Sequence, residues 1–273
     1  MIKKSLFGLI CLIILAYISF CASVYLLPQL YFYNPSSQKE DLTKAINEGF
    51  NATEVSFFTK DGIKLYGWFI KPQPNKKTIV FYHGNSYNIA AFYHKLKPFA
   101  KLGYGIFIGE YRGFGGISGK INQSNLQKDA LAVIDYLNQQ GIQNSDIILY
   151  GMSLGSFTST YTAANSQKDF AALILEVPFD SILNVVKQRI PNIFPFSLII
   201  KDKYDNTSNI SKINIPILIM LAENDKVVPK QRGENLFKYA NHPKKLIIYP
   251  NAKHSNLFDY NNWTDIINWL NDK

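Results

Sequence analysis

Cysteine is scarce in this sequence, and its positions limit what it can do. The 273 residues include only Cys11 and Cys21, and both lie in the apolar stretch near the N-terminus. The remainder of the chain has no cysteine, so an internal disulfide is excluded there, and with it a small fold held together by disulfide bridges. Cysteine usage therefore carries no information about the redox state of the compartment in which the protein works.

Concentrated positive charge is missing as well. The formal net charge is +9, but the lysines are scattered, with only short pairs such as Lys76-Lys77 and Lys244-Lys245. A nucleic-acid-binding protein is expected to carry a basic stripe with interleaved aromatic residues or a recognisable binding module, and neither is present. We therefore expect no nucleic-acid partner. A composition of 47% hydrophobic and 18% charged residues, without internal repeats, is typical of one globular domain.

Charged residues are also absent from residues 5–27, directly after Lys3 and Lys4. In a helix, about 23 residues at 1.5 Å each would cross the roughly 30 Å of hydrocarbon in a bilayer. We predict that residues 1–27 form a membrane anchor. The alternative is a cleaved secretory signal, for which residues 21–23 offer a cleavage site. The anchor is favoured because the apolar run continues well beyond the roughly 7 to 15 residues of a typical signal.

The charge on either side of this segment predicts its orientation. Two lysines precede it, and no basic residue follows until Lys39. Positive residues stay on the cytoplasmic side, so we expect a single-pass protein with a cytoplasmic N-terminus and a folded domain on the translocated side, in the periplasm, the extracellular space or a lumen. Residues 28–49 then form a linker, whose aromatic run at 31–33 suits either the membrane interface or docking onto the domain. The domain is expected at residues 50–273.

Beyond residue 50, short apolar runs of the kind found in buried strands alternate with longer helical stretches. This alternation predicts an α/β fold with a mostly parallel central sheet and helices on both faces. The first two strands are joined by a tight turn, which predicts an antiparallel hairpin. One long insertion, residues 178–212, interrupts the pattern. We expect strands at 53–59, 63–70, 78–82, 105–110, 146–150, 171–177, 216–221 and 245–249, and helices at 88–101, 123–140, 154–165, 230–240 and 261–271.

The most informative segment is the pentapeptide Gly-Met-Ser-Leu-Gly at residues 151–155, which follows the predicted strand 146–150. A glycine-flanked serine between a strand and a helix is typical of a nucleophile elbow, a sharp turn that exposes the serine hydroxyl. Gly151 and Gly155 would give the backbone room to turn and pack closely. The pattern alone is common by chance, so its position at the end of a strand is what supports it. We predict that Ser153 is a nucleophile.

Polar residues at the ends of later strands complete a catalytic triad. In parallel sheets, functional groups gather at the carboxyl ends of the strands. Asp225 follows the strand at 216–221 and His254 follows the last strand, so the chain order is Ser, Asp, His, as in one architecture of serine hydrolases. For the acid, Asp180 and Glu176 remain alternatives. The other histidines are expected to have structural or surface roles, and they are His83, His94 and His242.

Two further motifs follow earlier strands, His83-Gly84-Asn85 and the run from Glu110 to Gly116, which contains Arg112. Together with the elbow, the segment 224–229 and His254, they make the chain resemble the α/β-hydrolase family. Within that family it resembles membrane-anchored hydrolases of the Bem46-like, ABHD13 and ABHD17 types, over about residues 50–272. It departs from them at 117–121, where the relatives continue with a proline-containing stretch. This difference lies in a loop and leaves the triad residues in place.

The resemblance implies a role for each of these residues. Ser153 would attack an acyl carbon, His254 would take up and return its proton, and Asp225 would fix the imidazole tautomer. The backbone N–H groups of Asn85 and Leu154 would form the oxyanion hole, with the Asn85 side chain as a further possible donor. The surrounding loops would be shaped by His83, Gly84, Gly151, Gly155 and Arg112, the last through a buried ion pair or, less favoured, by contact with an anionic substrate.

We therefore predict a serine hydrolase that cleaves carboxylic esters or thioesters and requires neither a metal nor a cofactor. The membrane tether and the apolar residues of the insertion 178–212 indicate a small-molecule or lipid-like ester as substrate. Two alternatives remain open. One is a peptidase of the serine aminopeptidase type, because the same triad cleaves amides. The other is a non-catalytic, membrane-tethered binding protein on a hydrolase fold.

Overall fold

A central β-sheet organises the domain in the computed structural model, which describes residues 2–166, 169–191 and 193–272. Within these ranges the sheet has eight strands in the order β10-β9-β8-β7-β4-β6-β3-β2. Only β3 runs antiparallel to both of its neighbours, and the remaining pairs are parallel. The strands are β2 (Thr53–Phe58), β3 (Lys64–Ile70), β4 (Thr78–Tyr82), β6 (Gly105–Gly109), β7 (Ile147–Met152), β8 (Ala172–Glu176), β9 (Ile217–Ala222) and β10 (Lys244–Tyr249).

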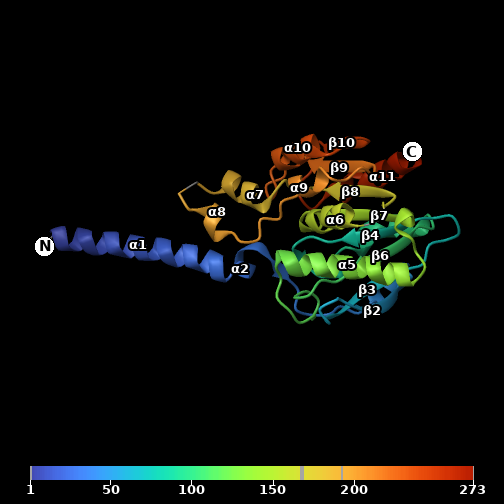
Figure 1. Cartoon of the computed structure of the whole chain (residues 1–273), viewed down its shortest axis with the longest axis horizontal. Helices are drawn as coiled ribbons and strands as arrows, with labels where there is room; N and C mark the ends of the chain where they lie inside the picture. Colours follow the sequence, from blue (N-terminus) through green and yellow to red (C-terminus); the bar gives the residue numbers. More distant parts are fainter. Residues whose placement is uncertain (1, 167–168, 192, 273) are drawn as a thin grey trace.

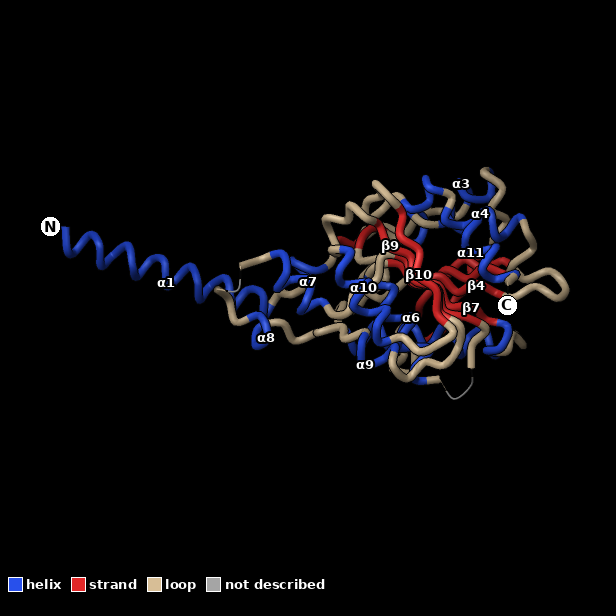
Figure 2. Tube along the Cα trace, turned by 90° about the horizontal axis from the view of Figure 1, so that it is seen from above, coloured by secondary structure: helices blue, strands red, loops and turns tan. Residues whose placement is uncertain are grey.

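Helices cover both faces of the sheet (Figure 2) because most of its strands are apolar on both sides. Along β9 the side chains alternate between two hydrophobic clusters, with Ile217 and Ile219 in one and Leu218 and Met220 in the other. The first cluster is completed by α5 (Gln123–Gln139), α6 (Leu154–Asn165) and α10 (Lys230–Tyr239). The second is completed by α3 (Thr43–Asn47), α4 (Tyr93–Lys101) and α11 (Asn262–Asn271).

These observations confirm the predicted α/β-hydrolase fold and its opening hairpin, which pairs Thr53 with Phe69 and Phe58 with Lys64. All eight expected strands are present, with ends shifted by no more than two residues. Single 3-10 turns also occur, at η1 (Ile89–Ala91), η2 (Asn144–Asp146) and η3 (Leu257–Tyr260). The sheet therefore places the ends of β7, β9 and β10 along one edge, as the sequence pattern requires.

The segment after the apolar helix is more than a spacer. It contains α2 (Gln29–Phe32) and the short strand β1 (Asn34–Pro35), which pairs in parallel with β5 (Ser86–Tyr87). Farther along, α3 buries Ala45 and is followed by the fully buried Phe50. This segment is thus hydrogen-bonded and packed onto the domain.

The apolar helix α1 (Ile2–Leu26) projects away from the domain, and its N-terminal end lies far from the sheet (Figure 1). Its portion Lys4–Leu26 is long and apolar enough to cross a membrane, and only 6% of that window is buried. The C-terminal turns of α1 contact the insertion, which forms α7 (Ile182–Arg189), α8 (Phe196–Ile199) and α9 (Thr207–Ile210). Val24 packs there in a small separate cluster with Phe196, Ile199 and Ile200.

Candidate active site

Ser153 occupies the turn between β7 and α6. Its backbone has φ 52° and ψ −115°, a positive-φ conformation that is costly for a residue with a Cβ. The turn is held by hydrogen bonds on both sides. The Ser153 N–H donates to the carbonyl of Glu176 at 2.9 Å, and the Ser153 carbonyl accepts from the Ser156 N–H at 2.9 Å. Strain of this kind persists only where the surrounding structure fixes it, and it is typical of functional sites.

The two glycines of the elbow are required by close packing. A Cβ on Gly155 would lie 1.9 Å from the carbonyl oxygen of Tyr82, and one on Gly151 would lie 2.3 Å from the carbonyl oxygen of Gly155. Real Cβ atoms do not approach backbone atoms this closely. Any side chain at either position would therefore push α6 away from the sheet and move Ser153.

Ser153, His254 and Asp225 form a continuous chain of hydrogen bonds. His254 Nε2 lies 2.9 Å from Ser153 Oγ, and His254 Nδ1 lies 2.6 Å from Asp225 Oδ2. The other carboxylate oxygen of Asp225 accepts the N–H groups of Val227 and Val228, both at 2.8 Å. These bonds fix the carboxylate, which in turn favours the imidazole tautomer that carries its proton on Nδ1. Nε2 is then free to accept the proton of the serine hydroxyl.

The alternative acids are engaged elsewhere. Asp180 accepts hydrogen bonds from the side chains of Asn184, Asn235 and Arg232 at 2.7 to 3.2 Å. Glu176 forms a buried ion pair with Lys95 at 2.7 Å. Neither carboxylate contacts His254 among the described residues, so Asp225 alone occupies the position of the acid.

Two backbone N–H groups beside Ser153 have no hydrogen-bond partner within the described chain. They belong to Leu154 and Asn85, and both residues line the same cavity as Ser153. This is the arrangement expected of an oxyanion hole. The Asn85 side chain differs from the expectation, because its amide nitrogen donates to the Phe32 carbonyl at 2.8 Å. Its backbone carbonyl accepts from the Asn34 N–H at 2.9 Å, so the segment after α1 holds this loop in place.

A buried pair supports the same loop from behind. His83 Nε2 lies 2.9 Å from Glu110 Oε1, and His83 Nδ1 lies 2.8 Å from the Gly84 carbonyl oxygen. Glu110 Oε2 also accepts the Ile89 N–H at 2.9 Å, which ties both ends of the loop to one carboxylate. The sequence analysis did not predict that Glu110 holds this loop. The only signal was its position at the end of a strand.

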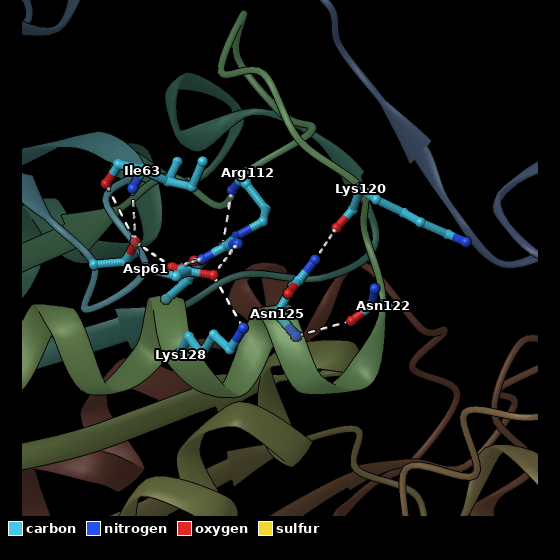
Figure 3. A network of polar contacts seen from close by, with 9 residues as sticks. Asp61, Ile63, Arg112, Lys120, Asn122, Asn125 and Lys128 are labelled. Atoms are coloured by element: carbon cyan, nitrogen blue, oxygen red, sulfur yellow. Dashed lines mark hydrogen bonds and ion pairs between the residues drawn. The ribbon is translucent and has the colours of Figure 1, made fainter.

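Arg112 is buried and links two parts of the domain, and Figure 3 shows its contact with Asp61. It is 3% exposed, and its guanidinium donates to Asp129 Oδ1 at 2.6 and 2.8 Å and to both carboxylate oxygens of Asp61 at 2.9 Å. The guanidinium holds the pKa of Asp61 well below its usual range. Burial raises the pKa of Asp129. All three guanidinium nitrogens of Arg112 thus donate to carboxylates on α5 and the β2–β3 turn. The side chain does not line the cavity that contains Ser153.

The cavity next to Ser153 has a volume of about 330 Å³ and is mostly apolar. One end is formed by Asn85, Ser153 and Leu154, and the other by residues of α7, α8 and α1. The buried hydroxyls of Tyr33 and Tyr204 hydrogen-bond to each other in its wall, and burial raises the pKa of both phenols, which keeps them neutral. The contribution of Phe20 and Val24 from α1 was not predicted from the sequence. No cluster of three or more His, Cys, Asp or Glu side chains suited to a metal ion occurs among the described residues.

The sequence is similar to a known protein family and to individual proteins of bacteria and yeast. The profile of the prolyl oligopeptidase family matches residues 90–272. The protein YfhR of Salmonella typhi is 29% identical over 277 residues, which cover 94% of this chain and 89% of that protein. A membrane protein of Saccharomyces cerevisiae is 26% identical over 226 residues, covering 81% of this chain and 80% of its own length.

Among solved structures, an esterase of Pyrococcus furiosus is similar, with a TM-score of 0.69 and 18% sequence identity. The match covers 88% of this chain and 96% of the esterase. At this level of identity the likeness shows a shared fold.

Proposed function

The chain belongs to the prolyl oligopeptidase family, and on this premise we propose that it is a serine hydrolase that cleaves carboxylic esters or thioesters through an acyl-enzyme. The observation that carries the proposal is the hydrogen-bonded chain Ser153–His254–Asp225, which ends beside two unpartnered N–H groups at one end of an apolar cavity. We also propose that it belongs to the membrane-anchored α/β-hydrolases of the Bem46-like, ABHD13 and ABHD17 types that its motifs resemble.

The geometry supports an acyl-transfer mechanism. Ser153 Oγ attacks the acyl carbon while its proton passes to His254 Nε2, and Asp225 stabilises the resulting imidazolium. The developing oxyanion receives hydrogen bonds from the N–H groups of Leu154 and Asn85. His254 then protonates the departing alcohol or thiol. Water, activated by the same imidazole, attacks the acyl-enzyme and releases the carboxylic acid.

The lining of the cavity favours an apolar acyl group over a charged one. Of the residues that line it in the described part of the chain, only Arg189 carries a charge, and the rest are mainly aliphatic and aromatic. Burial of an acyl chain against such surface contributes about 0.8 kcal/mol per methylene group. The esterase activity of the Pyrococcus furiosus protein, which has the same fold, is consistent with this assignment.

A peptidase is the second candidate, because the matched family is named after peptidases that cleave short peptides. The same triad cleaves amides when the pocket captures a peptide. A pocket that binds a free amino terminus is expected to present a carboxylate to it. Neither Asp nor Glu lines the described cavity, and Arg189 would repel an amine, so the ester assignment is preferred.

A direct test compares p-nitrophenyl esters of increasing chain length with p-nitroanilide peptides, using the full-length protein in detergent. We expect ester hydrolysis that improves with acyl length and is lost in Ser153→Ala. Peptide cleavage faster than ester cleavage would replace the proposal by the peptidase. Ester hydrolysis that survives in Ser153→Ala would contradict the assignment of the nucleophile.

We further propose that α1 is retained as a membrane anchor, with the catalytic domain on the translocated side. Its apolar length and the membrane relative support association with a bilayer. Retention is favoured because cleavage near residues 21–23 would remove Phe20 from the cavity wall and cut beside Val24, which is 4% exposed. The intact mass of the purified protein tests this, since cleavage would remove more than 20 residues.

A further inference from the structure

The membrane helix forms part of the cavity that contains Ser153. Phe20 and Val24 of α1 line it together with Ile190, Phe196 and Ile200 of the insertion. We call these five residues the anchor-side wall. Val24 is buried in the cluster that includes Phe196 and Ile200, so the contact is a packed interface. A soluble enzyme would have no reason to build its acyl pocket against a lipid-exposed helix.

Contacts between α1 and the insertion reach into the apolar span itself. The Tyr17 hydroxyl donates to the Ile193 carbonyl at 3.0 Å, and the Tyr17 ring stacks on Phe194 with centroids 5.2 Å apart. Tyr17 lies about 14 Å from Leu26 along the helix axis. The span Lys4–Leu26 is about 35 Å long, against roughly 30 Å of bilayer hydrocarbon. If this span crosses the bilayer, the part of the insertion that contacts Tyr17 therefore extends into the apolar part of the leaflet nearest the domain.

The side chains at this end of the molecule suit a bilayer surface. Leu30, Ile193 and Leu198 are 69%, 67% and 75% exposed, and all three belong to the segments that follow or contact α1. Tyr31, which lies just after α1, adds an aromatic ring of the kind typical of the membrane interface. Lys201 Nζ lies 3.6 Å from the ring centroid of Tyr25, near the end of α1, where an ammonium group would meet lipid phosphates.

We propose that the substrate is a lipid ester resident in the bilayer, whose acyl chain passes from the leaflet along the anchor-side wall to bring its carbonyl to Ser153. This inference rests on the proposed function and adds the substrate class and its route. In the reaction the ester C–O bond breaks, water adds across it, and a fatty acid and an alcohol leave. The acyl ester bonds of membrane lipids lie at the boundary of the hydrocarbon, close to the level at which Phe20 and Val24 are expected.

The test uses the full-length protein in lipid nanodiscs and two substrates, a long-chain monoacylglycerol held in the bilayer and p-nitrophenyl acetate in the water. Val24→Trp fills the cavity from α1. The matched control is Ile13→Trp, on the same helix but 60% exposed and outside the cavity. We expect Val24→Trp to lower the ratio of monoacylglycerol to acetate hydrolysis about tenfold or more, and the control to leave the ratio unchanged.

A second variant guards against misfolding of the first. Ile190→Trp fills the same cavity from a position that is 37% exposed, and it is expected to lower the same ratio. An unchanged ratio in a folded variant whose Ser153 still reacts with a fluorophosphonate would overturn the lipid route and leave the hydrolase intact. Faster cleavage of a soluble S-acylated peptide than of the bilayer ester would also overturn it. Absence of both fluorophosphonate labelling and ester cleavage would instead remove the proposed function.

Discussion

Two regions meet at the cavity, and they are built in opposite ways. Ser153, Asp225 and His254, which we call the catalytic edge, follow three neighbouring or nearby strands of a sheet buried on both faces. The anchor-side wall combines Phe20 and Val24 of α1 with three residues of the insertion, and one small hydrophobic cluster holds the two parts together. Under the proposed function, this difference implies a division of labour. The rigid core would fix the reacting atoms, and the smaller part beside α1 would select the substrate.

The largest effect is expected from the catalytic edge itself. Ser153→Ala removes the nucleophile, so kcat/KM should fall by about 10⁴ to 10⁶ for every ester, regardless of acyl length. A substitution in the anchor-side wall should instead change the ranking of substrates. Steady-state kinetics over the ester series distinguishes the two behaviours. A Ser153→Ala variant that loses activity only toward long chains would erase the distinction between the regions.

The next largest effect distinguishes Asp225 from Asp180, two carboxylates that follow neighbouring strands. Asp225→Asn leaves the imidazole without the acceptor that fixes its tautomer, and kcat should fall by about 10³ to 10⁴. Asp180→Asn is the matched control, because Asp180 is fully buried but bonds to Asn184, Arg232 and Asn235. It should lower stability while leaving kcat within about tenfold. Equal losses of kcat in both variants would contradict the assignment of the acid.

A third effect concerns the scaffold behind the catalytic edge. Arg112→Met leaves Asp129 buried without its partner and should lower the free energy of unfolding by about 3 to 5 kcal/mol. Lys128→Met removes an exposed ion pair with Asp61 and should cost at most about 1 kcal/mol. Denaturant unfolding monitored by circular dichroism gives both values. Similar losses of unfolding free energy in the two variants would show that the buried ion pairs of Arg112 stabilise the fold no more than the exposed one.

The ion pair between Arg112 and Asp61 predicts that the stability of the fold depends on pH. Because Arg112 lowers the pKa of Asp61 in the folded state, this ion pair stabilises the fold above the usual carboxyl range, and the gain is lost as the pH falls through the lowered value. Acid also protonates Asp129 in Arg112→Met, which relieves its unpaired charge. The stability gap between wild type and variant should therefore narrow toward low pH. A gap that widens in acid would contradict this sign.

The smallest effect comes from the strained turn. Ser153→Gly permits the positive φ without a Cβ and should raise the free energy of unfolding by about 1 kcal/mol, while abolishing activity. Ala163→Gly, at a partly buried position within α6, should instead destabilise by about 1 kcal/mol. Thermal unfolding compares them. A loss of stability in Ser153→Gly would mean that the turn carries no releasable strain.

The strands and the turn at Ser153 could be predicted from the sequence because their determinants are local. Buried strands appear in the sequence as short apolar runs. The turn at Ser153 needs glycine at 151 and 155 because backbone atoms lie too close to either position for a Cβ. Asp225 and His254 could be placed because parallel strands end on one edge. The roles that these residues play in catalysis remain predictions.

The anchor-side wall could not be predicted for a physical reason. It depends on packing between residues 20–24 and residues 190–200, and side-chain contacts across such a distance leave no periodic signal in one sequence. The strands β1 and β5 have only two residues each, and α8 and α9 have only four, too few to show a pattern. The Asn85 side-chain amide donates to the Phe32 carbonyl, a contact with the segment after α1 that the sequence alone does not indicate.

The most direct test is labelling of the full-length protein by a fluorophosphonate, followed by peptide mass mapping. In the proposed mechanism, His254 activates the Ser153 hydroxyl through the hydrogen bond between Nε2 and Oγ. We therefore predict a single adduct on Ser153 that is absent in Ser153→Ala and forms far more slowly in His254→Ala. An unlabelled protein that is demonstrably folded, or an adduct on another serine, would contradict it.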